Sequence, residues 1–422
     1  MDFFCLIVYV ALWIVTFIKY QRKRKCYDAG SLILTAYLVT SVFSMFLFLD
    51  KSGDYVLRGL SLFPFLLLWT LLLLGGLPVL KYDGRGREVT NPNMKIIIGI
   101  CVIFIIASLL SVGSTIRSFR SGLSLIMTTD EGGADLYSQA IGESENYGRG
   151  GLSHLPAVII TALTPICAFF LFYLIRYFKN YKLLTYFLIF SFVLLLMQYI
   201  SLGSRGSVAE ILIIILSSYF IFRPYYSTKT VSALNKLFLI LFIMVMFPIV
   251  AISISRFAST SGGASSSTFF YLGQSNLYFN KYALDDGGIR YGDRVIPLFK
   301  RMAFRPNVPH NFWERRAKYP HLKINDEVFI TYAGDFLIDF GPLFGTLILV
   351  IISMFFIKIT RARGSLIGFH QLIILHLVIV NCTIGAIKLF PFSDVGGNLQ
   401  LIVYFLAFIV FNPQIKYSSN AR

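Results

Sequence analysis

Hydrophobic residues along the chain gather into eleven blocks, most of them near twenty residues long, with polar segments between them. A helix needs about 20 predominantly apolar residues to cross the roughly 30 Å hydrocarbon layer of a bilayer. We therefore predict an all-α, polytopic integral membrane protein with about eleven transmembrane helices. The predicted spans are 3–18, 29–49, 59–80, 96–116, 154–175, 183–200, 207–222, 237–254, 333–357, 365–387 and 398–412.

Composition supports this class. Only 14% of the 422 residues are charged, whereas soluble proteins carry about 25%. The net charge of +17 lies largely in short loops between apolar blocks, where membrane topology explains Lys and Arg, so no nucleic-acid partner is expected. The five cysteines lie in apolar blocks or in one basic loop and show no disulfide or metal-binding spacing, so neither a metal nor another cofactor is expected.

The distribution of positive charge predicts the orientation. Counting from the basic run 19–25, alternate connections and the C-terminal tail carry twenty Lys and Arg, against seven in the short segments of the opposite side. The long loop 255–327 carries eleven more, but long loops translocate largely regardless of charge. The first block also precedes its basic run, which is the reverse of a signal peptide. We expect the N-terminus outside and the C-terminus in the cytoplasm.

Two segments on the outer side are long. Residues 117–153 are rich in Gly and Ser and predict a loop with little fixed structure. Residues 255–327 begin with a flexible run, 259–268, and then become basic and aromatic, a mixture more typical of a folded cap than of a linker. The chain thus divides into helices 1–8 (1–254), a long, partly structured external loop (255–327), and helices 9–11 with the tail (328–422).

Arg205 lies in a very short outer connection, Ser201 to Ser207, and therefore at the membrane boundary. Gly203 and Gly206 on either side would let a ligand approach the backbone, and a guanidinium matches phosphate oxygens in a bidentate manner. The alternative is an arginine that only reaches towards lipid headgroups. Glu210 follows inside the next span, either as a general base or as the partner of a neighbouring cation.

Arg256 ends the eighth predicted span on the same side as Arg205. Each arginine alone is an ordinary boundary residue. Together they would hold a pyrophosphate whose lipid tail stays in the bilayer.

The loop that follows is strongly basic, and its field would concentrate anions. The alternative is attraction to anionic outer-leaflet lipids. His310 and His321 are candidates for proton transfer, or loop residues that only form hydrogen bonds. The candidate substrate-binding residues here are Arg290, Arg301 and Arg305, and the other basic residues are Arg294, Lys300, Arg315, Arg316, Lys318 and Lys323.

Two carboxylates, Asp335 and Asp339, stand at i, i+4 spacing at the outer end of the ninth predicted span. That spacing places both on one helix face, which must meet protein or water. They would bind substrate or, as the alternative, pair with nearby arginines. Gly341, Pro342 and Gly345 would kink the helix or allow close packing.

Several motifs are absent from the sequence. It contains no Walker-type phosphate loop, no His-Glu-x-x-His and no Gly-x-Ser-x-Gly. Nothing therefore indicates ATP hydrolysis or metal-centred chemistry.

The order of the remaining motifs resembles the oligosaccharide repeat-unit polymerases, the O-antigen polymerase family. The resemblance rests on the 203–206 turn, a second arginine that closes the next outward span, a long external loop, and Gly334-Asp335-Phe336 followed by Asp339-Phe340-Gly341 and Gly345. An Arg-ten-residues-Gly pattern of some members does not start at either arginine. The motifs cover residues 200–345 and the hydropathy covers the whole chain.

The resemblance implies a metal-independent glycosyltransferase of the GT-C type, which joins undecaprenyl-pyrophosphate-linked oligosaccharides outside the cytoplasmic membrane. Arg205 and Arg256 would bind the pyrophosphates, membrane lipids would surround the chain, and a chain-length regulator protein is a possible partner. The rivals are a polysaccharide ligase that uses the same lipid donor and a transporter (flippase) for an anionic lipid or solute. The scarcity of charge within the spans, apart from Glu210, His370 and His376, speaks against a transporter.

Overall fold

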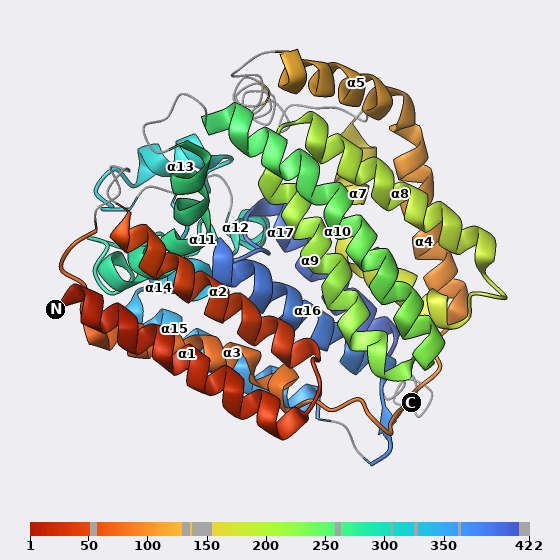
Figure 1. Cartoon of the computed structure of the whole chain (residues 1–422), viewed down its shortest axis with the longest axis horizontal. Coiled ribbons are helices and arrows are strands. Elements are labelled where there is room, and N and C mark those ends of the chain that lie inside the picture. Colours follow the sequence, from red (N-terminus) through yellow and green to blue (C-terminus); the bar gives the residue numbers. More distant parts are fainter. Residues whose placement is uncertain are drawn as a thin grey trace. The chain divides into compact units, whose positions relative to one another are not determined.

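A computed structural model describes residues 1–50, 57–128, 136, 154–257, 263–304, 307–324, 328–361 and 364–412. The side chains of 126–128, 255–257, 263–265 and 304 are outside this description. Helices make up most of the described residues (Figure 1). The strands β1 (Glu88–Val89) and β2 (Leu366–Ile367) have two residues each. The chain forms two compact units, a discontinuous unit (Met1–Asp83 with Ser265–Arg422) and a continuous unit (Gly84–Ala264).

The discontinuous unit is built around one buried helix, α16, which packs against α2, α3, α14 and α17. Its most apolar window is 78% buried, because neighbours surround it on several sides. The helices of this unit are α1 (Asp2–Arg24), α2 (Ala29–Leu49), α3 (Leu62–Lys81), α11 (Gly263–Tyr282), α12 (Pro297–Phe304), α13 (Phe312–Lys318), α14 (Thr331–Phe340), α15 (Pro342–Ile359), α16 (Phe369–Ile387) and α17 (Asp394–Val410).

The continuous unit has α7 as its most buried helix, with α4, α8 and α9 packed against it (Figure 1). By contrast, α10 buries only 17% of its most apolar window, which is typical of a helix that faces lipid. The helices here are α4 (Met94–Leu110), α5 (Val112–Thr128), α7 (Leu155–Arg176), α8 (Lys182–Ser201), α9 (Arg205–Phe222), the short η3 (Arg223–Tyr225) and α10 (Thr228–Phe257).

The prediction of a polytopic, all-α membrane protein is confirmed. Within the described ranges, nine helices are long and apolar enough to cross a bilayer, and a tenth span results if α4 and α5, bent by 54° at a short break, count as one. The eleventh predicted span, 398–412, corresponds to α17, an apolar helix of 17 residues that is short for a full crossing. No described feature tests the predicted orientation or the three-part division along the chain.

The ninth predicted span, 333–357, is not one helix. It divides at Gly341, whose φ of 81° lies outside the range of a right-handed helix, and Pro342 then begins α15. The first part, α14, is buried from Thr331 to Asp339, whereas α15 buries only 17% of its apolar window. The division into two helices has a physical reason. Asp335 and Asp339 need polar partners, which a lipid-facing helix cannot provide.

Part of each predicted loop is also helical. Residues 117–128 belong to α5, and the run predicted as flexible, 259–268, is helical from Gly263, while 258–262 and most of 129–153 lie outside the described residues. The polar composition of α11 is typical of a loop in the sequence. In the structure its polar side chains form hydrogen bonds with other helices.

The buried polar face of α11 makes these bonds at three helices. Tyr9 of α1 donates to Asn276 Oδ1 over 3.1 Å, and Asn276 Nδ2 donates to Ser44 Oγ of α2 over 3.0 Å. Ser275 Oγ donates to the carbonyl oxygen of Ala386 in α16 over 2.9 Å. These bonds satisfy polar groups that would be costly to bury alone.

Candidate functional site

The turn between α8 and α9 is closed by Gly203. Its φ of 61° is a left-handed conformation that glycine adopts without a Cβ penalty. The amide of Gly203 donates to the carbonyl of Ile200 (3.0 Å), and the amide of Ser204 donates to that of Tyr199 (3.1 Å). This pair of bonds is the Schellman arrangement that ends many helices. It lets α9 begin at once, so Arg205 becomes its first residue.

The Arg205 side chain turns towards α10. It is 8% exposed, and its Nη1 donates a hydrogen bond of 2.9 Å to Ser253 Oγ. Ser253 and Arg256 are three residues apart in α10 and therefore lie on neighbouring turns of one helix face. The guanidinium of Arg205 thus meets α10 one turn before the second predicted arginine, within the continuous unit.

The other predicted residues of this region lie on α9 and α10. The backbone of Arg256 is helical, but its side chain lies outside the described residues. Gly206, in the first turn of α9, and Glu210, one turn further on, are half-buried. Sequence reasoning missed Ser253, although a hydroxyl three residues before an arginine on a helix is a readable signal.

A second cluster of predicted residues lies in the discontinuous unit. Arg290 Nη2 lies 3.0 Å from Asp335 Oδ1, and its Nε lies 2.7 Å from Asp339 Oδ1. A second arginine, Arg294, lies 3.5 Å from Asp335 Oδ1 through Nε. Both carboxylates are fully buried, and Arg290 is 2% exposed. The predicted pairing of the two aspartates with arginines is confirmed.

The second oxygen of each carboxylate accepts backbone bonds. Asp339 Oδ2 accepts from the amides of Arg294 (3.1 Å) and Val295 (2.7 Å), and Asp335 Oδ2 accepts from Phe390 (2.8 Å). The two carboxylates therefore fix the segment before α12 and the segment after α16 onto α14. With these partners the two carboxylates form a buried brace, and their assignment to substrate stays a prediction.

Asp293 is the centre of a neighbouring cluster that sequence reasoning did not single out. It is fully buried and forms ion pairs with Lys300 and with Lys318, the latter at 2.6 Å. The hydroxyl of Tyr319 lies 2.7 Å from its carboxylate. Burial alone would raise the pKa of Asp293, but the bonds from Lys300, Lys318 and Tyr319 outweigh burial and hold the pKa below its usual range. Burial and Asp293 together raise the pKa of Tyr319.

Two of the remaining predicted loop residues, Arg301 and His310, lie on neighbouring parts of the segment around α12. Arg301 is half-buried, and its Nη2 donates to the carbonyl of Pro309 over 2.5 Å. His310 is exposed, with its backbone amide donating to the Glu314 carboxylate over 2.6 Å. Arg305 lies outside the described residues.

Compared with models of known families, with curated proteins and with solved structures, the chain matches none. Within the described ranges, no three His, Cys, Asp or Glu side chains lie together as a metal site would require. The α9–α10 contact brings together the guanidinium of Arg205 and the hydroxyl of Ser253, both of which can donate hydrogen bonds to anionic oxygens.

Proposed function

We propose that this protein polymerises undecaprenyl-pyrophosphate-linked oligosaccharide repeat units into a surface polysaccharide (O-antigen, capsule or exopolysaccharide) at the outer side of the cytoplasmic membrane. It would act as a metal-independent glycosyltransferase of the GT-C type. The observation that carries the proposal is the 2.9 Å bond from Arg205 to Ser253, because it brings one predicted arginine to within a helical turn of the other.

Both arginines would act on the pyrophosphate of the donor. The hydroxyl of the acceptor sugar attacks the anomeric carbon of the growing chain, and the bond from that carbon to the pyrophosphate oxygen breaks. Negative charge then develops on the departing pyrophosphate, where preorganised guanidinium donors are worth most. The hydroxyl proton goes to a base, for which Glu210 and His310 are the predicted candidates.

The test is a genetic one. Arg205→Ala and Arg256→Ala each abolish long-chain polysaccharide while the protein level in the membrane stays normal. Arg361→Ala removes an exposed arginine from the predicted cytoplasmic side and serves as the matched control. Normal chain lengths in both site variants would refute the assignment of the arginines.

Deletion of the gene separates the proposal from its rivals. A polymerase leaves single lipid-linked repeat units outside the membrane, which gel analysis of the lipid-linked glycan detects. Full-length polymer stranded on its lipid indicates a ligase, and units trapped inside indicate a flippase. Either of these two results overturns the proposal.

A further inference from the structure

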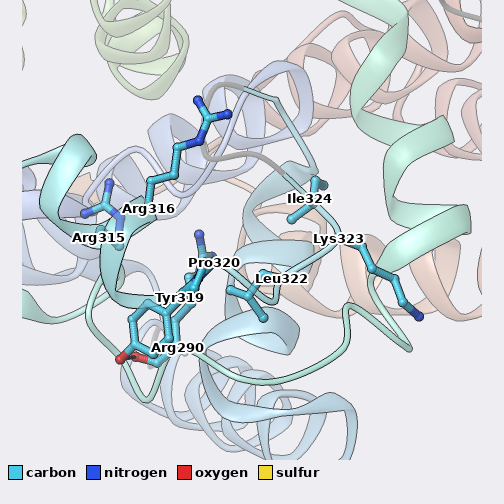
Figure 2. Close-up of a pocket in the computed structure, with 8 residues that line it drawn as sticks. All are labelled: Arg290, Arg315, Arg316, Tyr319, Pro320, Leu322, Lys323 and Ile324. Atoms are coloured by element: carbon cyan, nitrogen blue, oxygen red, sulfur yellow. Dashed lines mark hydrogen bonds between the residues drawn. The ribbon is translucent and has the colours of Figure 1, made fainter.

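A pocket of about 290 Å³ lies between α13 and the segment that follows it, inside the predicted external loop (Figure 2). Arg315 and Arg316 extend from α13 on one side, and Leu322, Lys323 and Ile324 border it on the other. Its lining residues are Arg290, Arg315, Arg316, Tyr319, Pro320, Leu322, Lys323 and Ile324. Four of these eight residues are cationic and none is acidic, so the wall favours an anion.

The four cations differ in how far other groups neutralise them. The guanidinium of Arg290 is held by the buried brace. Arg315 pairs with Asp394 at 2.9 Å, and Lys323 pairs with an exposed carboxylate, Asp285, at 2.5 Å. Arg316 is exposed, and no carboxylate pairs with it in the part of the chain that the structure describes. Exposed ion pairs contribute little, so Lys323 can exchange its partner for a ligand at small cost.

The frame of the pocket is fixed by buried bonds. The hydroxyl of Tyr319 lies 3.0 Å from the carbonyl oxygen of Arg290 and is also bonded to Asp293. On the other side, the amide of Lys323 donates to the carbonyl of Asp286 (2.9 Å), and the amide of Ile324 donates to its carboxylate (2.8 Å). A site whose walls are already held from two sides loses little conformational entropy when a ligand binds.

We propose that this pocket binds one acidic sugar, a ring that carries a carboxylate or a phosphate, through Arg316, with Lys323 at the opposite border of the pocket. Small-ligand pockets measure about 300–1,000 Å³, so this one lies at the small end and suits a single ring. An arginine fork matches carboxylate and phosphate oxygens, while Pro320 and Leu322 offer apolar surface to the C–H groups of the ring. The glycan as the source of that sugar rests on the proposed function.

Binding is measured on the whole purified protein in phosphatidylcholine nanodiscs, with trigalacturonic acid as the acidic probe and galactotriose as the neutral probe. Trp313, in α13 and 45% exposed, reports through its fluorescence, and calorimetry provides a second readout. The acidic probe binds, the neutral probe does not, and added salt weakens binding. Arg316→Gln lowers the affinity about tenfold or more, while Arg361→Gln, with the same change of charge, leaves it unaltered.

Each of three results with these probes would overturn the proposal: equal binding of both probes, no binding of the acidic probe, or unchanged affinity in Arg316→Gln. A further arm uses nanodiscs with phosphatidylglycerol. If that lipid alone produces the Arg316-dependent signal and displaces the acidic probe, the pocket is a headgroup site and the sugar proposal fails. These experiments measure binding and not turnover. Their failure can therefore be distinguished from a failure of the tests of polymerase activity.

Discussion

At the scale of single residues, the buried brace is the feature with the largest expected effect on stability. Arg290 lies between Asp335 and Asp339, and both carboxylates are fully buried. Removing one partner of such a pair leaves an uncompensated charge in a medium that solvates it poorly. The exposed pair between Lys323 and Asp285 is the natural comparison, because water solvates its partners when the pair is broken.

Arg290→Ala should therefore destabilise the protein by about 3–5 kcal/mol. Thermal unfolding of the detergent-solubilised protein measures the change, and Lys323→Ala, which breaks an exposed pair, should leave the transition almost where it was. Equal shifts of the unfolding transition in the two variants would show that the buried brace contributes no more to stability than the exposed pair does.

Asp293 predicts a dependence on pH. Its pKa in the folded protein lies below the ordinary value of about 3.9, so its stabilising contribution is complete above that pH. As the pH falls further, through the folded-state pKa, the carboxylate is protonated and the contribution is lost. Relative to the intrinsic exchange rate at each pH, amide exchange in α12 and α13 should rise below about pH 4, and in Asp293→Asn it should already be faster at pH 7, with a smaller further rise on acidification.

The sequence predicted the residue types of the brace but not all of its members. The i, i+4 spacing of Asp335 and Asp339 predicted that both lie on one helix face and either bind substrate or pair with arginines, of which the basic loop offered many. The sequence could not show which arginines pair with the aspartates. Arg290 is 45 residues from Asp335, and whether the two meet depends on how the loop folds. Ser253 illustrates the opposite case, since its position relative to Arg256 follows from helix geometry alone.

At the scale of elements, hydropathy predicted most spans well and failed where an apolar segment must also carry buried charge. The apolar character of 333–357 continues through Gly341, so hydropathy alone joins α14 and α15, although Gly341 and Pro342 predicted a kink at the point where the two helices separate. In α11 the prediction failed in the opposite way, because a run predicted as flexible is helical from Gly263. Its Ser, Gly and Asn residues resemble a loop, but their partners include Tyr9, which is 267 positions from Asn276. Such contacts between distant segments are invisible to any local pattern.

At Gly345, α15 packs directly against the backbone of α14. A Cβ at this position would lie 2.5 Å from the carbonyl oxygen of Phe336, which is backbone and cannot turn aside. Gly345→Ala should therefore destabilise the protein by about 1–3 kcal/mol. Gly99, within α4, has open space around it, so Gly99→Ala should instead raise stability slightly, because alanine favours helix. Melting temperatures of the two variants should move in opposite directions, and a rise for Gly345→Ala would contradict the close packing.

At the scale of the whole molecule, charge asymmetry predicts the N-terminus outside and the large loop on the same side. Cysteine labelling tests this in a Cys26→Ser background, since the other four cysteines are buried. A membrane-impermeant maleimide added to cells with a permeabilised outer envelope should label Met302→Cys, whose parent side chain is 74% exposed on α12. Lys23→Cys should be labelled only after the membrane itself is opened. The reverse pattern would invert the topology.

The discontinuous unit has a consequence for biosynthesis. Its first three helices leave the ribosome before α11, whose Asn276 satisfies Tyr9 and Ser44. Translation of residues 84–264 takes on the order of 10–40 s, and throughout that time these hydroxyls lack their native partner on α11 in the bilayer. A chain that ends at residue 262 should therefore be degraded faster than the full chain in a pulse-chase experiment, and co-expression of residues 263–422 should protect it. Equal half-lives would mean that the hydroxyls of the first helices find other hydrogen-bond partners before α11 is synthesised.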